Sequence, residues 1–297
     1  MTASAEGLLA TCWSSAGDAA SDRADLRSPL PLRERVEAAA AGFRGFGLRS
    51  ADLPAAEEAY GLNGIRAMLD DNGIVDLELE GIPHWWDDGP RRAESDLIRH
   101  SVLTAAQALG ARHISVNPDG DDAPWDPDHW VAEFAELAAQ AEGVGARLGL
   151  EFFPWSNIKN LEAGLRLAEA AGHDAAGVVI DVWHVERAHT PAADLASIPL
   201  HRIIGVELND ADPEVVGTLY EDTVHRRRYC GEGRSTSPGS SRPCGRPGGP
   251  VRGVWRSCPR STGPCTSAMP SPALPPVRAA CWMRRPVGAG RLLNLCW

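Results

Sequence analysis

The sequence lacks the long apolar stretch that a membrane-spanning helix requires. No run of about 18 consecutive apolar residues occurs in the 297-residue chain. Its first residues also do not combine a basic segment with an apolar run, as a secretory signal would. We therefore expect neither a membrane span nor secretion, and we predict a cytoplasmic protein. With 43% hydrophobic and 23% charged residues, the chain can bury a large core, which excludes fibrous and wholly disordered classes.

Positive charge is scarce over most of the chain. Up to Glu232 there are 19 Lys and Arg against 40 Asp and Glu, which gives a charge of −21, whereas ten arginines after it give +10. An acidic main body of this kind repels nucleic acids and anionic lipids. We therefore expect a small-molecule partner, and neither nucleic acid nor membrane. Whether the chain forms a homo-oligomer stays open.

Two common binding motifs are also missing. The seven cysteines include no C-x-x-C pair, and the five after Gly233 have no histidine nearby, which argues against a zinc module. No G-x-G-x-x-G phosphate loop follows the first predicted strand, where Thr11 to Ser15 stand instead. An open dinucleotide-binding sheet is therefore disfavoured.

Short apolar runs alternate with longer amphipathic ones from residue 7 to residue 210. This alternation is typical of βα units around a parallel sheet. Seven strands are predicted, at 7–13, 43–49, 74–80, 113–117, 147–153, 177–182 and 202–208. Helices are predicted at 31–41, 54–70, 91–109, 127–142, 158–171 and 192–198. A repeat of about 25 to 35 residues favours the α/β class and a (β/α)8 TIM barrel over an open sheet.

Ionisable residues stand where the predicted strands end, which in a parallel barrel is the active face. Glu151 lies within the apolar run 148–153, and Asp181 and His184 form a D-x-x-H pattern that can direct oxygen and nitrogen toward one ion. Glu207 gives a third acidic strand end. Three carboxylates at one dry rim repel one another unless a divalent cation neutralises them. We therefore predict a metal site formed by Glu151, Asp181 and Glu207.

Each of these residues also has a purely structural interpretation. A buried acid near a strand end is often a hydrogen-bonded structural group, and a histidine there is often a satisfied core residue. Trp155 is a candidate for substrate binding, and together with Trp85, Trp86 and Trp183 it either walls a sugar-sized pocket or packs the core. The sequence leaves these alternatives open.

Several segments resemble one known family. They are F-R-G-F-G-L, L-E-F-F-P-W-S-N-I, V-I-D-V-W-H, V-E-L-N-D and R-Y-C-G-E-G, between residues 7 and 233. They resemble the sugar phosphate isomerase/epimerase family, which has a xylose isomerase-like TIM barrel, in a superfamily that also includes apurinic endonucleases. The resemblance implies one divalent metal, Mn, Mg, Co or Zn, held by residues from strands five to eight. It matches Glu151 and Asp181 to metal ligands, His184 to the histidine that follows the aspartate, and Arg228 to a substrate-binding position.

The chain departs from the family at two points. Glu207 stands where the family commonly has the histidine of an H-x-x-D motif, although a carboxylate can still bind a hard cation. The positions that the endonucleases fill with further zinc ligands hold Glu80, Asn117 and Arg227. Together with the acidic body, these residues disfavour DNA cleavage.

The resemblance implies a divalent-metal-dependent isomerase or epimerase that transfers an α-proton, with a small-molecule sugar or polyol ketone as its partner: a ketose, a sugar phosphate or a cyclic polyol ketone. The metal would polarise the carbonyl and stabilise the enediolate, Glu151 would act as acid and base besides ligating, and His184 would bind metal or substrate oxygen. A dehydratase of an inosose-like ketone needs the same parts and is an alternative. An inactive sugar-binding remnant is the alternative outside enzymes.

The composition changes after Gly233. From there the chain has no Asp, Glu, Lys, His, Phe, Tyr or Ile, but eleven prolines and ten arginines. We therefore expect a barrel domain over 1–233 and a low-complexity tail over 234–297 that is disordered or read in a shifted frame. One permitted back-translation, shifted by a base, yields G-V-E-I-L, an eighth strand with a glutamate. On this hypothesis the barrel is incomplete, with two open edges and one ligand missing; resequencing the coding DNA tests it.

Overall fold

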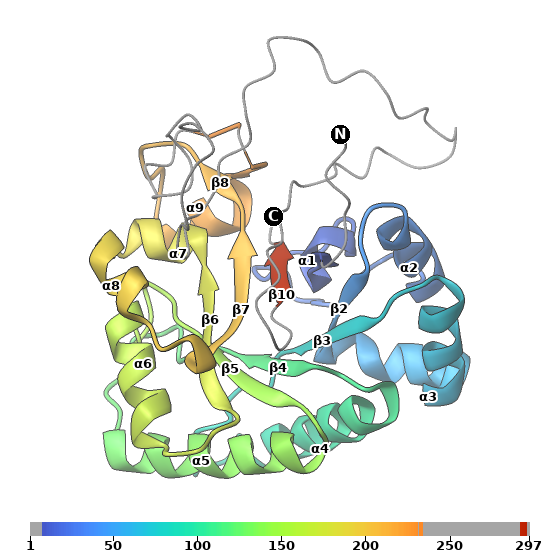
Figure 1. Ribbon diagram of the computed structural model, residues 1–297, viewed down its shortest axis with the longest axis horizontal. Coiled ribbons are helices and arrows are strands. Elements are labelled where there is room, and N and C mark those ends of the chain that lie inside the picture. Colours follow the sequence, from blue (N-terminus) through green and yellow to red (C-terminus); the bar gives the residue numbers. More distant parts are fainter. Residues whose placement is uncertain (1–7, 231, 234–291, 296–297) are drawn as a thin grey trace, which may run out of the picture.

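The computed structural model describes residues 8–230, 232–233 and 292–295, and parallel strands form a barrel at its centre (Figure 1). Around the barrel the strand order is β1-β10-β7-β6-β5-β4-β3-β2, and all neighbours pair in parallel. The barrel strands are β1 (Leu8–Ala10), β2 (Gly45–Arg49), β3 (Asp76–Glu80), β4 (His113–Val116), β5 (Arg147–Glu151), β6 (Ala176–Asp181), β7 (Ile203–Leu208) and β10 (Leu292–Leu295). The predicted α/β TIM-barrel class is therefore confirmed.

Helices follow the strands and cover the outside of the barrel (Figure 1). They are α1 (Cys12–Ser15), α2 (Leu32–Ala40), α3 (Leu53–Asp71), α4 (Arg92–Leu109), α5 (Pro127–Gly143), α6 (Leu161–Ala170), α7 (Val182–Arg187), α8 (Ala192–Ser197) and α9 (Leu219–His225). Two 3-10 turns, η1 (Ser50–Asp52) and η2 (Leu200–Arg202), precede α3 and β7. A short antiparallel pair, β8 (Asp210–Ala211) and β9 (Arg227–Arg228), lies beyond the end of β7.

Local sequence signals explain several helix ends. At α5 the side chain of Asp126 accepts a hydrogen bond from the backbone N–H of Asp128 at 3.0 Å, and Pro127 occupies the first helical position, where its missing N–H costs nothing. At the end of α4, Gly110 adopts the left-handed conformation with φ 67°, which favours glycine. These two ends lie where the sequence predicts them.

Other boundaries differ from the predicted ones. The predicted strand 7–13 ends early, because Cys12–Ser15 turn into α1. The predicted helix 54–70 is present as α3 but breaks at Gly61, whose backbone has φ 61° and ψ 159°. Likewise β6 ends at Asp181, because the next residues start α7. At the ends of β1 and β6 a short helix begins directly after the strand, and an apolar run gives no signal that separates the two.

The expectation of two open barrel edges is wrong for the described residues. Strand β10 occupies the eighth position, with Leu293 in register with Leu8 on β1 and with Val206 on β7. The chain beyond Gly233 therefore supplies a strand that its composition did not predict. The rest of the predicted tail lies outside the described residues, and its shifted reading frame stays a prediction.

The inside of the barrel is unusually acidic. Glu78, Glu80, Glu151, Asp181 and Glu207 all lie on barrel strands and are buried. Near the amino-terminal end of the barrel, Glu78 Oε2 lies 3.0 Å from Nε2 of the buried His113, the first residue of β4. Buried carboxylates are costly unless they are paired, protonated or bound to a cation, so this interior needs positive charge or protons.

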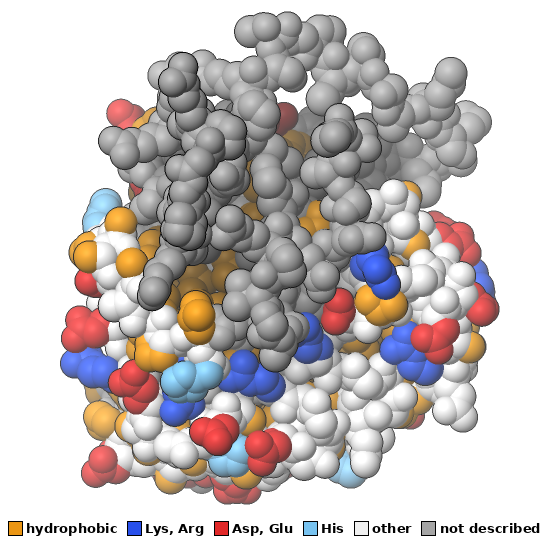
Figure 2. All heavy atoms as spheres, in the orientation of Figure 1, with side chains coloured by type: hydrophobic (Ala, Val, Ile, Leu, Met, Phe, Trp, Pro, Cys, Tyr) orange, Lys and Arg blue, Asp and Glu red, His pale blue; other side chains and the backbone are white. Residues whose placement is uncertain are grey.

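Outside the barrel, acidic and basic side chains are interspersed over the described part of the face in Figure 2. Within the described residues, each helix is too short or too polar to cross a bilayer.

Candidate metal centre

Two neighbouring strands end in carboxylates at the same rim of the barrel. Glu151 is the last residue of β5, and Asp181 is the last residue of β6. Because the carboxyl ends of parallel strands share one edge, both side chains stand at the barrel mouth. Both are buried, and Asp181 is fully inaccessible to solvent.

Asp181 also starts the helix that carries the candidate histidine. Its Oδ1 accepts hydrogen bonds from the backbone N–H of Trp183 at 2.7 Å and of His184 at 3.3 Å, so Asp181 is the N-cap of α7. The D-x-x-H spacing therefore holds the imidazole in the first turn of a helix, directly beside the strand end. Local capping is what brings these two side chains together.

Glu151 and His184 are in direct contact. Glu151 Oε1 lies 3.1 Å from His184 Nε2, and Glu151 Oε2 accepts a hydrogen bond from Asn117 Nδ2 at 3.0 Å. The other imidazole nitrogen, Nδ1, is buried and has no hydrogen-bond partner among the described residues. One side of the ring is thus fixed by Glu151, and the other side carries Nδ1, which is free to take a proton.

The donor set fits a divalent cation. Glu151, Asp181 and His184 each offer one ligand atom, and these three atoms lie within 4.8 Å of one another. Two carboxylates with an imidazole suit Mn, Mg, Co or Zn. The nitrogen of His184 that faces Glu151 and Arg227 is Nε2, whereas the buried Nδ1 has no hydrogen-bond partner among the described residues.

An arginine already gives Asp181 a positive partner. Arg227, on β9, donates from Nη1 to Asp181 Oδ2 at 2.5 Å, and Asn209 Nδ2 donates to Oδ1 at 3.0 Å. Burial acts to raise the pKa of Asp181, but the charges of Arg227 and His184 and these hydrogen bonds outweigh it, so the pKa is lowered. Asp181 is therefore anionic, and a cation bound there shares it with a guanidinium.

Glu207 lies next to Asp181 but in a different electrostatic situation. It is in register with Asp181 across the β6–β7 pair and is 1% exposed. Burial, followed by the charges of Glu151, Glu78 and Asp181, raises its pKa well above the usual range. A protonated Glu207 relieves the crowding of charge, and a cation at this rim would favour its ionised form.

A second cluster of polar side chains, formed by Glu80, Cys12, Trp13 and Arg49, lies across the rim at the ends of β1 to β3. Glu80, the last residue of β3, accepts hydrogen bonds from Cys12 Sγ at 2.8 Å and from Trp13 Nε1 at 3.2 Å. Burial raises the pKa of Glu80 to about 7, against the opposing charge of Arg49. Burial, and then Glu80, also raises the pKa of the Cys12 thiol. The group therefore holds a carboxyl that exchanges its proton near neutral pH.

The aromatic candidates divide into two sets. Trp155 has its ring centroid 5.4 Å from that of His184 and stacks on Phe153 at 4.7 Å, and Trp183 lies 5.3 Å from the same imidazole. These rings belong to the candidate centre. By contrast, the pair Trp85 and Trp86 packs with Trp130 and Phe134 at the start of α5, where it is part of the core.

Arg228 does not reach the cluster. It is exposed, and its Nε and Nη2 donate to Asp212 Oδ2 at 3.1 and 2.7 Å. The neighbouring Arg227 enters the centre instead, since successive residues of a strand face opposite sides. Sequence reasoning pointed to the right segment but missed Arg227, and it also missed the group around Glu80, whose only signal was an acid at a strand end.

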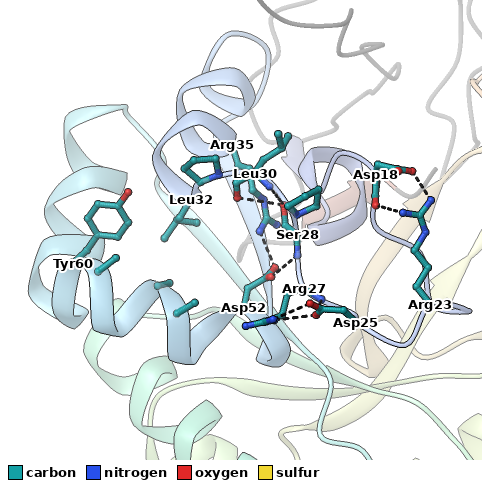
Figure 3. Close-up of a pocket in the computed structure, with 15 residues that line it drawn as sticks. Asp18, Arg23, Asp25, Arg27, Ser28, Leu30, Leu32, Arg35, Asp52 and Tyr60 are labelled. Carbon is teal, nitrogen blue, oxygen red and sulfur yellow. Dashed lines mark hydrogen bonds and ion pairs between the residues drawn. The ribbon is translucent and has the colours of Figure 1, made fainter.

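A separate cavity of about 660 Å³ lies beside α2 and the start of α3 (Figure 3). At its edge Arg35 Nη1 and Asp52 Oδ2 form a buried ion pair of 2.7 Å, and Asp52 Oδ1 also accepts the backbone N–H of Ser28 at 2.8 Å. None of the residues of the candidate centre lines this cavity. The hydrogen bonds within it are internal, so we assign it to structure.

Comparison with known proteins agrees with the barrel fold. The family described as Xylose isomerase-like TIM barrel matches residues 36–238. A curated protein, the 3-dehydroshikimate dehydratase of Pseudomonas putida (strain KT2440), is 27% identical over 212 residues, which is 70% of this chain and 33% of that protein.

Solved structures share the fold. A xylose isomerase-like TIM barrel/4-hydroxyphenylpyruvate dioxygenase fusion protein superposes with a TM-score of 0.66 at 23% identity, over 77% of this chain and 35% of that one. The IOLI protein with a binding zinc atom gives a TM-score of 0.64 at 17% identity, over 77% and 81% of the two chains. The chain thus spans about a third of the length of the dehydratase and of the fusion protein.

Proposed function

Because the chain belongs to the xylose isomerase-like TIM barrel family, we propose that it is a metal-dependent dehydratase of a cyclic hydroxy-ketone acid such as 3-dehydroshikimate. The convergence of Glu151, Asp181 and His184 at one rim carries the proposal. The 3-dehydroshikimate dehydratase to which the chain is 27% identical supports loss of water over other outcomes of the same proton transfer.

The anionic residues of the rim would hold the cation. Glu151 and Asp181 would bind it, with Glu207 in register beside Asp181. A divalent cation bound there would polarise a ketone oxygen and make the neighbouring C–H more acidic. Asp181 is kept anionic by Arg227 and is therefore ready to bind.

His184 is the residue best placed to take the proton. Its Nε2 side faces Glu151, which fixes the ring, and its Nδ1 has no partner among the described residues. An imidazole held in this way can remove a proton from the carbon next to the ketone. Trp155 and Trp183 pack around the ring and exclude water from it.

Glu80 is the candidate for the acid. With a pKa of about 7, a large fraction of this carboxyl is protonated at neutral pH, so it can protonate the hydroxyl that leaves from the β carbon as water. In 3-dehydroshikimate the C–H electrons form the new double bond as that C–O bond breaks. A further proton shift from ring carbon to ketone oxygen then gives an aromatic dihydroxybenzoate.

The test is direct, because the product absorbs in the ultraviolet as a dihydroxybenzoate. The full chain is incubated with 3-dehydroshikimate and Mn²⁺, Mg²⁺ or Co²⁺, and the aromatic product is followed by absorbance and chromatography. We expect product only with a metal, and its loss in Glu151→Gln but not in Glu162→Gln, an exposed glutamate on α6. A folded, metal-loaded chain that forms no aromatic product contradicts the proposal.

An isomerase or epimerase of a sugar or sugar phosphate is the second candidate. Epimerisation needs two groups that exchange protons with the substrate. Glu151 and His184 would form one of them, and Glu80, with a pKa of about 7, is suited to be the other. A panel of ketoses in D₂O distinguishes the two reactions. Deuterium that enters the α carbon without loss of water supports the isomerase.

A further inference from the structure

Arg49 occupies a prominent place at the barrel mouth without a protein acceptor. It is the last residue of β2 and lies in register with Glu80, the last residue of β3. Its Nε and Nη1 are buried and have no hydrogen-bond partner among the described residues. Buried guanidinium donors are nearly always satisfied, so an arginine of this kind is expected to have a partner that is not part of the described protein.

The position of Arg49 is fixed by its neighbours. Its guanidinium carbon lies 4.1 Å from the ring centroid of Trp13, a close cation–π contact. Trp13 is itself tied to Glu80 through its indole N–H. Among the described residues Arg49 forms no ion pair with Glu80, whose two oxygens accept hydrogen bonds from Cys12 and Trp13. Arg49 is thus held rigidly while its donors stay available.

Arg49 and the candidate metal centre lie on opposite sides of Glu80. Glu80 is within electrostatic range of both Arg49 and Glu151, and β2 and β5 are separated by β3 and β4. With neighbouring strands ~4.8 Å apart, the strands span roughly 14 Å along the wall, and the long side chains reach inward from both ends. A small ring with an anionic group at one end and a hydroxy ketone at the other matches this arrangement.

We infer that Arg49 binds the carboxylate of the substrate and so selects a hydroxy-ketone acid over neutral sugars. The inference rests on the proposed function, because it assigns the remaining end of the same substrate. A planar guanidinium is suited to a carboxylate, with which it forms charge-assisted hydrogen bonds. Arg49 thus determines which substrates bind, whereas His184 and Glu80 transfer the protons.

The experiment measures binding and needs no turnover. Shikimate carries the ring and the carboxylate but no ketone, and its methyl ester replaces the negative charge by one methyl group. Calorimetric titrations of both compounds are made with the full chain, with Mn²⁺ and with EDTA. The variants are Arg49→Gln and Arg49→Lys, and Arg166→Gln, at an exposed position of α6, is the matched control.

We expect the unaltered chain and Arg166→Gln to bind shikimate about tenfold to a hundredfold more tightly than the ester, as charged hydrogen bonds imply. Arg49→Gln should abolish that preference by weakening shikimate binding alone, and Arg49→Lys should keep part of it. Inorganic phosphate serves as a competitor, and displacement of shikimate by phosphate more strongly than by acetate would assign the site to a phosphate instead.

Three results overturn the inference. They are equal binding of acid and ester by the unaltered chain, no binding of either, and an Arg49→Gln variant that is folded by circular dichroism and keeps the preference. The proposed function fails separately. A chain that binds shikimate through Arg49 but never forms a dihydroxybenzoate from 3-dehydroshikimate retains the carboxylate site and loses the dehydratase assignment.

Discussion

Arg227 donates directly to Asp181, so a guanidinium from the short β8–β9 pair neutralises the carboxylate that ends barrel strand β6. Its Nη2 also lies 3.4 Å from Nε2 of His184. The charge of the candidate centre is therefore balanced by a residue outside the barrel wall. The first prediction follows from this pair.

Replacing Arg227 by Gln should leave Asp181 buried without its cation. Removing one partner of a buried ion pair costs about 3 to 5 kcal/mol, so we expect the melting temperature in EDTA to fall by several degrees. Because Mn²⁺ would then supply the missing charge, the increase in melting temperature on adding Mn²⁺ should be larger than in the unaltered chain. Arg228→Gln, at the exposed neighbour, is the control and should change neither value; equal behaviour of the two variants would contradict the role of Arg227.

Glu151→Gln should weaken binding of Mn²⁺ by about a hundredfold or more, since even residues behind metal ligands contribute tenfold to a hundredfold. The amide keeps the size of the side chain and the contact with Asn117, but it loses the anionic oxygen beside His184. Calorimetric titration with Mn²⁺ measures the change, with Glu162→Gln as control. Unchanged affinity in a folded Glu151→Gln protein would remove Glu151 from the metal site.

The pKa of about 7 at Glu80 predicts a dependence of stability on pH. The folded pKa lies above the ordinary value, so the folded state holds its proton more tightly than the unfolded state does. The stabilisation is complete below about pH 4.5 and is lost as pH rises toward 7, with a total of roughly 3 kcal/mol.

Glu80→Gln should therefore flatten the decline of stability between pH 5 and pH 7.5. Denaturant unfolding in EDTA at several pH values measures it. The raised pKa of Glu207 acts in the same direction, so some slope should remain in the variant. A slope identical to that of the unaltered chain would mean that Glu80 titrates normally.

The buried pair of Arg35 and Asp52 should show strong coupling. Their side chains are 2% and 9% exposed, and Arg35 Nη2 also donates to the carbonyl of Cys12 at 3.3 Å. Arg35→Met or Asp52→Leu alone should each cost about 3 to 5 kcal/mol, because each leaves one buried charge unpaired. The double variant should cost clearly less than the two together, and a double-mutant cycle by urea unfolding checks it. Additive effects would contradict the pairing.

Leu293→Pro should destabilise the barrel, whereas Leu293→Val should not. Leu293 lies in the middle of β10, between β1 and β7, and a proline in a central strand removes a backbone donor. We expect the proline variant to aggregate or to bind a hydrophobic dye, as exposed strand edges do. A proline variant as stable and monodisperse as the valine variant would show that β10 does not close the barrel.

The βα repeat was predictable because alternating apolar runs specify a parallel sheet with little ambiguity. Glu151, Asp181 and His184 were also predictable, since a polar residue that ends an apolar strand must lie at the rim. The choice between Arg227 and Arg228 was not, because it depends on which face of a two-residue strand turns inward.

Contacts between distant segments were equally hidden from the sequence. Cys12 and Trp13 come close to Glu80 because the chain turns into α1 at Cys12. The apolar run around them in the sequence does not predict that turn. Strand β10 escaped prediction because four residues within an Arg, Pro and Gly-rich stretch carry too little pattern. The four residues form a strand because the edges of β1 and β7 pair with them.

The late position of β10 in the chain sets an order of assembly. About 60 residues separate it from β9, and closing a loop of this length adds only a modest entropic cost. During synthesis, however, the strands β1 to β7 leave the ribosome well before β10 does. The nascent chain must therefore pass through a stage with two unpaired strand edges, which are prone to pair with other chains.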